Sequence, residues 1–390
     1  MPKRNRKQPQ AGATGNSGRV NRPSKPLPPP DATEPGGPST VTSYDVAQLA
    51  GVSQSAVSRC FRFGASISSR MRERVMQAAR ELGYSPDALA RSLTTRRSNL
   101  VAVIISNLTN LYYPEVLSEL NRRLTERNVH LLLFTIQTES DVDRILGQVW
   151  QYRVDGVIAA ARLSQKQMEE FDRRRVPIVF YNRYLRDRSV NAVCCDQIEG
   201  ARTIVNSLVQ TGHKTFGIVG GPEDSLVGEE RTRGSIDALK RSGITQIVRV
   251  RGDYTYEGGR RAFGELAAQL GKVPEAIICA ADVMAFGCLD AARFDRKLAI
   301  PEDLSVVGFD GVEPGGWSSY RLATIRQPVQ RMAEAVVSLL FECLADPERP
   351  PEKRVFSGTL IPGQSARLQQ PPTSSGHGER LHRPVAGPKR

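Results

Sequence analysis

The sequence is poor in the residues that metal centres and disulfide frameworks require. Its 390 residues include only four histidines, which are scattered, so we expect no metal site and no cofactor. No C-x-x-C pair occurs, and most of the cysteines fall in apolar segments. We therefore expect reduced, buried thiols in a cytoplasmic protein. The six cysteines are Cys60, Cys194, Cys195, Cys279, Cys288 and Cys343.

Long apolar runs are missing as well. No segment near the N-terminus resembles a secretory signal, and no stretch approaches the roughly 20 apolar residues of a membrane span. Residues 1–40 are rich in Pro, Gly, Ser and basic side chains, and residues 367–390 are rich in Pro. We expect both tails to be disordered, and we expect no membrane partner.

The common catalytic signatures are also missing. The chain has no P-loop, no G-x-G-x-x-G after a strand and no G-x-S-x-G elbow. A doubly wound enzyme is therefore the weaker alternative, and we expect a protein that is not an enzyme. A periplasmic sugar-binding protein is a second alternative, but it would need a secretory signal and would have no use for residues 42–93.

Positive charge is concentrated in three segments. Residues 1–40 carry a formal net charge of +5, residues 41–99 carry +5 and residues 367–390 carry +4, out of a total of +13. The long central part is therefore nearly neutral. This distribution is typical of a nucleic-acid-binding segment attached to a neutral body. The basic N-terminal tail either adds nonspecific attraction to phosphate or is simply solvated.

Residues 42–61 follow the pattern of two short helices joined by a tight turn. Thr42 or Ser43 can cap the first helix, and Gly51 can adopt the left-handed conformation that ends it. Ser53 can cap a second helix over about 54–61. The apolar stripe of the first helix consists of Val46, Ala47, Leu49 and Ala50.

The second helix presents a small, polar outer face that suits the major groove of DNA. Arg59 can bond guanine through two donors, and Gln54 and Ser55 suit base edges or phosphates. Ser58 lies on the same face. A third helix over about 69–82 carries basic side chains that are better placed for phosphate than for bases, namely Arg70, Arg72 and Arg74. The ordered set predicts a helix-turn-helix rather than an ordinary three-helix bundle.

These residues resemble the N-terminal domain of the lactose-repressor (LacI/GalR) family, whose start reads close to T-x-x-D-V-A-x-x-A-G-V-S-x-x-T-V-S-R. Eleven positions match in place, and Ala56 stands where the family usually has threonine. The matching positions are Thr42, Asp45, Val46, Ala47, Ala50, Gly51, Val52, Ser53, Val57, Ser58 and Arg59. The resemblance implies a DNA-binding surface made of Thr42, Ser43, Tyr44, Ser53, Gln54, Ser55, Ala56, Ser58 and Arg59.

The family's hinge helix, usually P-N-x-x-A-R-S-L, is matched by residues 86–93. In the family the final leucine wedges into the minor groove, and Leu93 occupies the matching position. Asp87 replaces the usual asparagine and adds a negative charge near DNA. The resemblance implies that Asp87, Ala90, Arg91 and Leu93 take part in DNA binding. We assign 41–86 to the helix-turn-helix domain and 87–99 to the hinge helix and linker.

From residue 100 onward, apolar strand-like runs alternate with helical stretches. Such alternation predicts parallel, doubly wound α/β sheets covered on both faces. Two series of four or five strands suggest two similar lobes within residues 100–366. We place lobe 1 at about 100–195 and 326–356, and lobe 2 at about 196–325 and 357–366.

Polar side chains follow the predicted strands, where ligands bind in open α/β sheets. Singly, each is better explained as a strand-end or helix-capping group, but jointly they suggest a site for a small polar ligand. In lobe 1 these residues are Asn107, Tyr112, Asn182 and Arg183. In lobe 2 they are Arg231, Tyr254, Asp282 and Asp310.

The family resemblance extends over about 42–366 and includes its effector domain, which has the periplasmic sugar-binding-protein fold. In the family, the residues matching Arg231 and Asp310 grip the effector's hydroxyl groups. Ala281 departs from the family's common asparagine, which puts the usual sugar in doubt, and an acidic effector is the alternative if Arg183 and Arg231 both face the cleft. The segments that carry the resemblance are N-L-T-N-x-x-Y at 107–113, D-G-V-I at 155–158, P-E-D-L-S-V-V-G-F-D at 301–310 and T-I-R-Q-P at 324–328.

These patterns predict a cytoplasmic, nucleoid-associated transcriptional regulator, most simply a repressor. We expect a homodimer on a palindromic DNA operator. A small polar effector, such as a sugar, a sugar acid or a sugar derivative, would control its affinity for DNA allosterically. The C-terminal tail lacks leucine heptads, so no coiled-coil tetramer is expected. The sequence leaves open whether the effector releases the protein from DNA or promotes binding.

Overall fold

The computed structural model describes residues 41–61, 66–85, 97–106, 108, 110–136, 141–223 and 225–369. The chain divides into two compact units, Met1–Pro86 and Asp87–Arg390, and each is considered by itself. Several predictions lie outside the described residues. They are the tail 1–40, most of the tail 367–390, and the site residues Asp87, Ala90, Arg91, Leu93 and Asn107.

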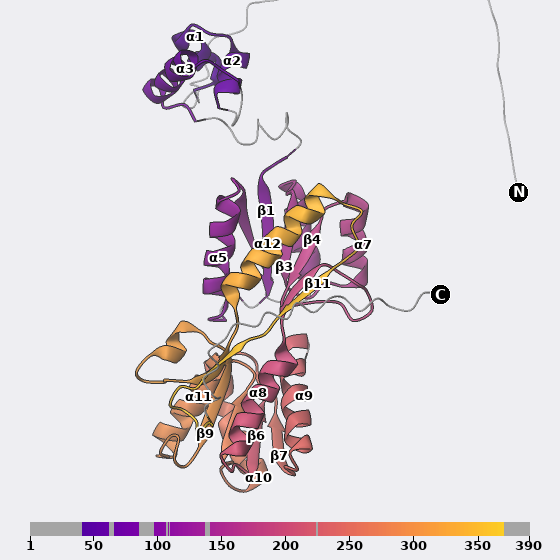
Figure 1. The fold of residues 1–390 in the computed structure, drawn as a ribbon, viewed down its shortest axis with the longest axis vertical. Helices are drawn as coiled ribbons and strands as arrows, with labels where there is room; N and C mark the ends of the chain where they lie inside the picture. The colour runs from indigo at the N-terminus through magenta and orange to yellow at the C-terminus, as the bar shows by residue number, and fades with distance from the viewer. Residues whose placement is uncertain are drawn as a thin grey trace, which may run out of the picture. The chain divides into compact units, whose positions relative to one another are not determined.

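The described part of the first unit contains three helices, α1 (Ser43–Ala50), α2 (Gln54–Cys60) and α3 (Ser69–Leu82), which are labelled in Figure 1. Their core is centred on three valines with no exposed surface, Val46, Val57 and Val75. Leu49 was expected in this core, but it is 51% exposed. It lies beside buried positions on α1 yet points outward, so the apolar stripe of α1 is narrower than predicted.

Local side-chain bonds fix where α1 and α2 begin and end. The Asp45 carboxylate accepts hydrogen bonds from the backbone N–H and the hydroxyl of Thr42, at 2.8 and 2.7 Å, and the Thr42 backbone bond is the largest cause of a lowered pKa for Asp45. Gly51 ends α1 with a φ of +61°. The Ser53 hydroxyl accepts from the Ala56 N–H at 3.2 Å. The predicted glycine turn and the Ser53 cap are therefore confirmed.

Within its described residues, the second unit contains two six-stranded sheets, one in each lobe. The sheet of lobe 1 has the order β11-β5-β4-β3-β1-β2, with parallel pairing throughout. Its strands are β1 (Leu100–Ser106), β2 (His130–Ile136), β3 (Gly156–Ala160), β4 (Ile178–Tyr181), β5 (Ala192–Cys195) and β11 (Lys353–Phe356). Its helices are α5 (Tyr113–Thr125), α6 (Val142–Gln151), α7 (Gln165–Arg174) and α12 (Val329–Ala345).

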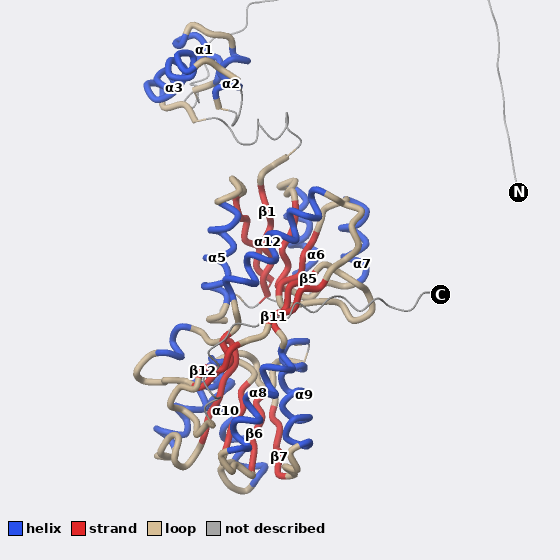
Figure 2. The backbone as a smooth tube through the Cα atoms, in the orientation of Figure 1, coloured by secondary structure: helices blue, strands red, loops and turns tan. Residues whose placement is uncertain are grey.

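Helices cover both faces of the lobe 1 sheet (Figure 2). Val103 and Ile105 of β1 pack in the core that includes α5 and α12, whereas Ala102 and Ile104 pack in the core that includes α6 and α7. Because alternate side chains of a strand face opposite ways, β1 is apolar throughout. This explains the unbroken apolar run at 101–105.

The sheet of lobe 2 has the order β12-β10-β9-β8-β6-β7, in which only the β10–β12 pair is antiparallel among the described pairs. Helices α10 and α11 contribute to one core and α8 and α9 to the other. Its strands are β6 (Thr215–Val219), β7 (Gln246–Val250), β8 (Ala276–Cys279), β9 (Ser305–Asp310), β10 (Ala323–Arg326) and β12 (Thr359–Ile361). Its helices are α8 (Gln197–Gln210), α9 (Leu226–Arg241), α10 (Tyr256–Leu270), α11 (Asp282–Asp290), the π-helix η2 (Ala291–Asp295) and the 3-10 helix η3 (Glu313–Gly316).

The two-lobed α/β architecture agrees with the sequence-based prediction, but the predicted four or five strands per lobe are too few. The strands without a predicted counterpart, β5, β10, β11 and β12, have four residues or fewer. Those at the sheet edges, β11 and β12, are only partly buried, so no apolar run marks them.

The described chain crosses between the lobes where β5 leads to α8, where β10 leads to α12 and where β11 leads to β12. These crossings bring residues near 196, 327 and 357 to the boundary between the lobes. Residues on the first two crossings belong to the site described below.

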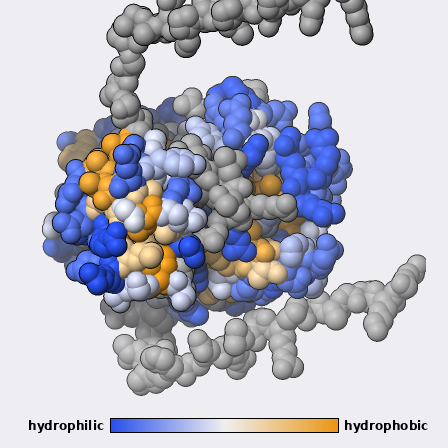
Figure 3. All heavy atoms as spheres, turned by 90° about the horizontal axis from the view of Figure 1, so that it is seen from above, coloured by the Kyte–Doolittle hydropathy of each residue, from blue (hydrophilic) through white to orange (hydrophobic). Residues whose placement is uncertain are grey.

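All six cysteines are free and buried, as expected. Within the described parts of the chain, no helix is both long and apolar enough to cross a membrane. Large apolar side chains that remain exposed include Tyr44, Phe294 and Trp317. Figure 3 shows the apolar residues of one face as patches interspersed with polar and charged ones.

Candidate nucleic-acid interface and ligand pocket

The starts of α1 and α2 form an exposed polar surface. Tyr44 is 71% exposed, and Ser53, Ser55, Ser58 and Arg59 are exposed as well. These side chains leave many donors and acceptors available to a partner. The predicted face of α2 therefore lies open, as reading a groove of DNA requires.

Two side-chain bonds order this surface. The Gln54 amide donates to the Ser43 hydroxyl at 3.2 Å, which ties the first turn of α2 to the first turn of α1. The Arg59 Nε donates to the Ser55 carbonyl at 3.3 Å, so the arginine lies along its own helix. Its terminal guanidinium nitrogens remain available for a bidentate contact.

Ala56 does not belong to this surface. It was predicted to contact DNA, but it is only 5% exposed and is buried like its neighbour Val57. The α2 positions around it alternate between the outer face and the interior with helical spacing, and position 56 falls inside. Ala56 therefore acts through packing in this structure, and its side chain is not placed to contact a base.

Two of the three arginines of α3 differ in role from the prediction. Arg72 donates to the Cys60 carbonyl at 2.7 Å, and Arg74 donates to the carbonyls of Ala50 and Gly51. Both guanidinium groups thus satisfy carbonyls at the ends of α1 and α2, which lack partners within their own helices. Arg70 is exposed and remains the best candidate of the three for a phosphate contact.

In the second unit, five buried side chains form a closed ring of polar contacts at the boundary between the lobes. We call Asn182, Gln197, Arg231, Asp310 and Gln327 the polar ring. The Asn182 amide donates to Gln327 at 2.7 Å, and Gln327 donates to Asp310 at 2.8 Å. Arg231 pairs with Asp310 at 2.9 Å and donates to Gln197 at 2.7 Å. Gln197 donates to the Asn182 oxygen at 3.3 Å and closes the ring.

The polar ring joins residues from both lobes. Asn182 follows β4 of lobe 1, whereas Asp310 ends β9 of lobe 2 and Arg231 lies on α9. Gln197 and Gln327 lie on the two crossings after β5 and β10. Any change in the angle between the lobes would therefore strain or exchange these bonds.

Aromatic side chains extend the polar ring. The Tyr112 hydroxyl lies 3.2 Å from the Asn182 amide and 3.1 Å from the Tyr181 hydroxyl. The guanidinium of Arg231 lies 3.8 Å from the centre of the Phe309 ring, a distance at which cation–π attraction operates. The site thus offers paired polar groups beside aromatic faces.

Burial and ion pairing shift the pKa values of the ionisable members of the polar ring in opposite directions. Burial is the largest single effect and lowers the pKa of Arg231, but Asp310, Tyr254 and Cys195 together outweigh it, so the pKa lies above its usual value. Burial raises the pKa of Asp310 although Arg231 counteracts it. Arg231 therefore stays charged, and the carboxyl beside it is more easily protonated than an ordinary aspartate.

Asp282 was predicted to contact the effector, and the structure places it beneath the turn that follows β9. It has no exposed surface, and its carboxylate accepts bonds from the N–H groups of Gly311 and Val312 and from the Thr324 hydroxyl. Burial, followed by the nearby Asp310, raises its pKa to about 7. Asp282 thus holds the turn after β9 through three hydrogen bonds.

Backbone conformation distinguishes three of the predicted site residues. Their φ angles are positive, namely +51° for Asn182, +59° for Tyr254 and +131° for Asp310. Residues other than glycine rarely adopt positive φ. The Tyr254 hydroxyl lies 2.8 Å from the Ser225 hydroxyl, which lies just before α9. Unusual backbone at strand ends commonly accompanies functional sites, since the surrounding structure must maintain it.

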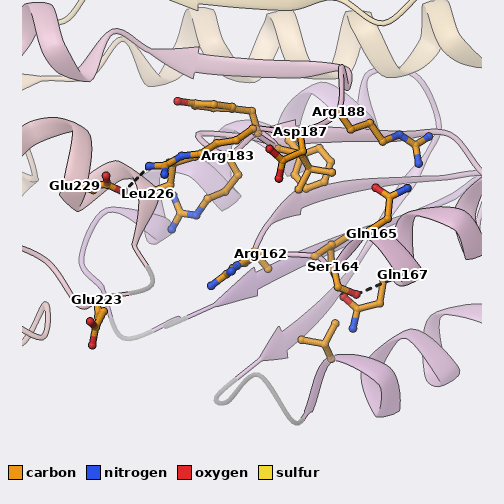
Figure 4. A pocket seen from close by; sticks show the side chains of 17 residues that line it. Arg162, Ser164, Gln165, Gln167, Arg183, Asp187, Arg188, Glu223, Leu226 and Glu229 are labelled. Atoms are coloured by element: carbon orange, nitrogen blue, oxygen red, sulfur yellow. Dashed lines mark hydrogen bonds and ion pairs between the residues drawn. The ribbon is translucent and has the colours of Figure 1, made fainter.

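A pocket of about 950 Å³ adjoins the polar ring through Arg183, the residue after Asn182. Its walls come from the segments after β3 and β4 in lobe 1 and from the start of α9 in lobe 2. In Figure 4 the guanidinium groups of Arg162 and Arg183 extend toward the same open space. Of the residues predicted to bind an effector, Tyr112, Asn182, Arg231 and Asp310 thus lie together, and Arg183 lies in the adjoining pocket.

Sequence reasoning missed Gln197, Gln327 and Tyr181. Gln327 lies within the T-I-R-Q-P segment already noted at 324–328, so that segment held the signal. Gln197 follows β5, a strand of four residues that was not predicted. Tyr181 closes an apolar strand and resembles an ordinary core residue until Tyr112 is placed beside it.

Two regions of the chain match known protein families. Residues 42–87 match the family described as bacterial regulatory proteins, lacI family, and residues 205–366 match a periplasmic binding protein-like domain. The chain is 28% identical over 338 residues to the probable HTH-type transcriptional repressor ExuR of Bacillus subtilis, covering 84% of the chain and 98% of the relative. It is 30% identical over 309 residues to the HTH-type transcriptional repressor CytR of Escherichia coli, covering 78% and 90%.

Two solved structures of transcriptional regulators are similar to this chain. The Lac repressor dimer bound to operator and the anti-inducer ONPF superimposes with a TM-score of 0.76 at 25% identity, covering 85% of this chain and all of that chain. The transcriptional regulator CelR in complex with cellobiose superimposes with a TM-score of 0.64 at 28% identity, covering 84% and all of that chain.

Proposed function

Since the chain belongs to the lacI family of bacterial regulatory proteins, we propose that it represses transcription under the control of a small polar ligand held between its lobes. The polar ring is the main support for ligand control. Its five side chains are buried at the lobe boundary and include both members of an ion pair. A polyol can replace such bonds one for one, because hydroxyl groups both donate and accept.

We infer that the protein binds DNA as a homodimer on a palindromic operator. The exposed face of α2 supports groove reading, and the similar Lac repressor is a dimer on its operator. Two-fold symmetry in the protein would match two-fold symmetry in the DNA. The hinge residues Asp87, Ala90, Arg91 and Leu93 remain predicted DNA contacts.

The ligand would act by exchanging bonds of the polar ring. Because Gln197 and Gln327 lie on lobe crossings, a ligand that replaces their partners would favour a different angle between the lobes. The resulting change in DNA affinity is a coupling free energy, and it must be equal in both directions. DNA would therefore weaken an inducer, or strengthen a corepressor, by the same factor.

Selection of DNA from a randomised pool by the full chain tests the first part of the proposal. We expect a palindromic consensus and a two-protomer complex in light scattering. Leu93→Ala and Arg59→Ala should each weaken binding to the selected site, measured by fluorescence anisotropy at fixed salt. If the recovered DNA shows no consensus, or if both variants bind the selected site with unchanged affinity, sequence-specific DNA binding is rejected.

A panel of sugars, sugar acids and sugar phosphates tests the second part. We expect at least one compound to raise the unfolding temperature and to change the affinity for the selected DNA. Arg231→Ala should remove that response, whereas Arg122→Gln, on the exposed surface of α5, should retain it. A normal response in Arg231→Ala would show that the ligand binds elsewhere.

A further inference from the structure

The pocket beside the polar ring differs in charge from the ring itself. Four arginines line it, together with three carboxylates. The arginines are Arg162, Arg183, Arg186 and Arg188, and the carboxylates are Asp187, Glu223 and Glu229. The charge that a ligand in this pocket would meet depends on which of these side chains already form ion pairs.

Most of the carboxylates are engaged by arginines. Glu229 pairs with Arg186 across the lobe boundary. Glu223 pairs with Arg251 at 2.8 Å. Arg188 is held at 2.8 Å by Asp172, which lies outside the pocket. The remaining lining carboxylate, Asp187, is exposed and lies between the two paired arginines in the sequence.

Arg183 is in a different situation. Its guanidinium donates to the Asn182 carbonyl at 2.8 Å, and no carboxylate among the described residues lies within ion-pair distance of it. It is half-buried, and its charge helps to lower the pKa of Asp310 against the larger effect of burial. A partly desolvated guanidinium with unused donors thus lies between the pocket and the polar ring.

Helix geometry adds to this positive character. Helices α7 and α9 both begin at the pocket, since Gln165 and Leu226, their first residues, line it. The N-terminal ends of helices carry partial positive charge. Among the described residues, two of the three lining carboxylates are thus already paired with arginines, whereas Arg183 is not paired with a carboxylate.

We propose that this pocket binds the anionic group of the effector, a carboxylate or a phosphate carried by a sugar, and that Arg183 is its principal contact. The inference rests on the proposed function and specifies the class of ligand. Arg162 adds positive charge facing the same space. Guanidinium groups bind carboxylate and phosphate through paired hydrogen bonds. The sugar's hydroxyl groups would meet the polar ring, and the volume of about 950 Å³ accommodates a ligand of that size.

Binding of matched acidic and neutral sugars to the full chain tests the proposal. The probes are glucuronate, galacturonate, glucose 6-phosphate and galactose 6-phosphate, with glucose and galactose as neutral counterparts. Thermal unfolding identifies binders, and titration calorimetry gives their affinities. We expect an acidic probe to bind at least about tenfold more tightly than its neutral counterpart, and comparison of the uronates with the phosphates identifies the anionic group.

Arginine variants assign the contact. Arg183→Gln should weaken the acidic probe by roughly 10- to 100-fold and leave the neutral sugar unchanged. Arg183→Lys should restore part of the affinity, because it keeps the charge and loses the bidentate geometry. Arg122→Gln removes an exposed arginine far from this pocket in the sequence and should bind the acidic probe normally.

Three results would overturn the inference: no acidic probe binds, a neutral hexose binds as tightly as its acidic counterpart, or Arg183→Gln keeps full affinity for the acidic probe. A neutral hexose that alters DNA affinity would overturn it while leaving the proposed function intact. Failure of the wild-type protein to select DNA would instead defeat the proposed function, and calorimetry would still report on the pocket.

Discussion

The exposed polar surface of α1 and α2 in the first unit and the polar ring of the second unit contain similar side chains in opposite environments. On α2, Ser55, Ser58 and Arg59 are exposed and keep most of their donors and acceptors unused. In the polar ring, Arg231 and Asp310 are each 5% exposed and bonded to neighbouring side chains.

On the surface of α2, a substitution should therefore affect binding without affecting stability. In the polar ring, a substitution should affect both. An exposed side chain can be removed with little effect on folding. A buried charged side chain leaves an unpaired partner when it is removed, so folding and ligand response should fail together.

Arg231→Met should lower the free energy of unfolding of the second unit by about 3–5 kcal/mol, because Asp310 would remain buried without its cation. Arg59→Met should change the stability of the first unit by less than about 0.5 kcal/mol. Urea unfolding of the full chain, followed by probes for each unit, measures both effects.

The double variant Arg231→Met/Asp310→Leu provides a matched control. It removes both charges and should recover part of the lost stability. If Arg231→Met is no less stable than Arg59→Met, the distinction between the buried and the exposed region fails.

Asp282→Asn should gain stability relative to the wild type as the pH rises from about 4 to about 7. Burial raises the pKa of Asp282 to about 7 in the folded protein, whereas an unfolded aspartate ionises near pH 4. Below about pH 4 both states are protonated and the carboxyl carries no penalty. Between the two pKa values ionisation favours the unfolded wild type, by roughly 1.4 kcal/mol for each unit by which the pKa is raised.

Urea unfolding of both proteins at about pH 5 and about pH 7.5 measures this difference. An exposed carboxyl offers a control, and Glu348→Gln should follow the wild type at both values. Parallel stability of wild type and Asp282→Asn across this range would mean that Asp282 titrates normally.

Arg59→Ala should weaken specific DNA binding by about 1–3 kcal/mol and relax the preference at one base pair. Its exposed position at the outer face of α2 gives it access to a base edge. Arg80→Ala, in the last turn of α3, should have a smaller effect that is uniform across sequences. Anisotropy titrations with the selected site and its single-base variants distinguish the two; equal losses on every sequence for Arg59→Ala would make it a phosphate contact.

The smallest effects separate Arg70 from Arg74. Arg74→Met should lower the stability of the helical unit by about 1 kcal/mol, because the carbonyls of Ala50 and Gly51 lose their donor. Arg70→Met should leave stability unchanged and reduce the salt dependence of DNA binding by about one unit of slope. If Arg74→Met instead reduces the salt dependence and Arg70→Met lowers the stability, Arg74 is the phosphate contact.

The sequence was most informative where local chemistry determines the structure. The bounds predicted for α3 agree with the observed Ser69–Leu82, and the Gly51 turn and the Ser53 cap depend only on near neighbours. Leu49, Ala56 and Arg74 were misassigned, because their environment is set by how the three helices pack against one another.

The site in the second unit was predictable in part. Asn182, Arg231 and Asp310 were found from polar residues at strand ends and from the family resemblance, and the structure brings them together. Gln197 and Gln327 were missed because their importance comes from the lobe crossings, which a local pattern does not reveal. The sequence did not reveal that Asp282 supports a turn, since a carboxylate after a strand can support a turn as well as bind a ligand.

The central claim is that occupancy of the site between the lobes controls DNA binding by the helical unit. Its most direct test is the affinity of the full chain for its selected DNA, measured by anisotropy with and without a saturating sugar, sugar acid or sugar phosphate that raises the unfolding temperature. We predict a change of at least about fivefold in one direction, with an equal and reciprocal effect of DNA on ligand affinity. An affinity for DNA that stays the same while the ligand saturates the protein would contradict the claim.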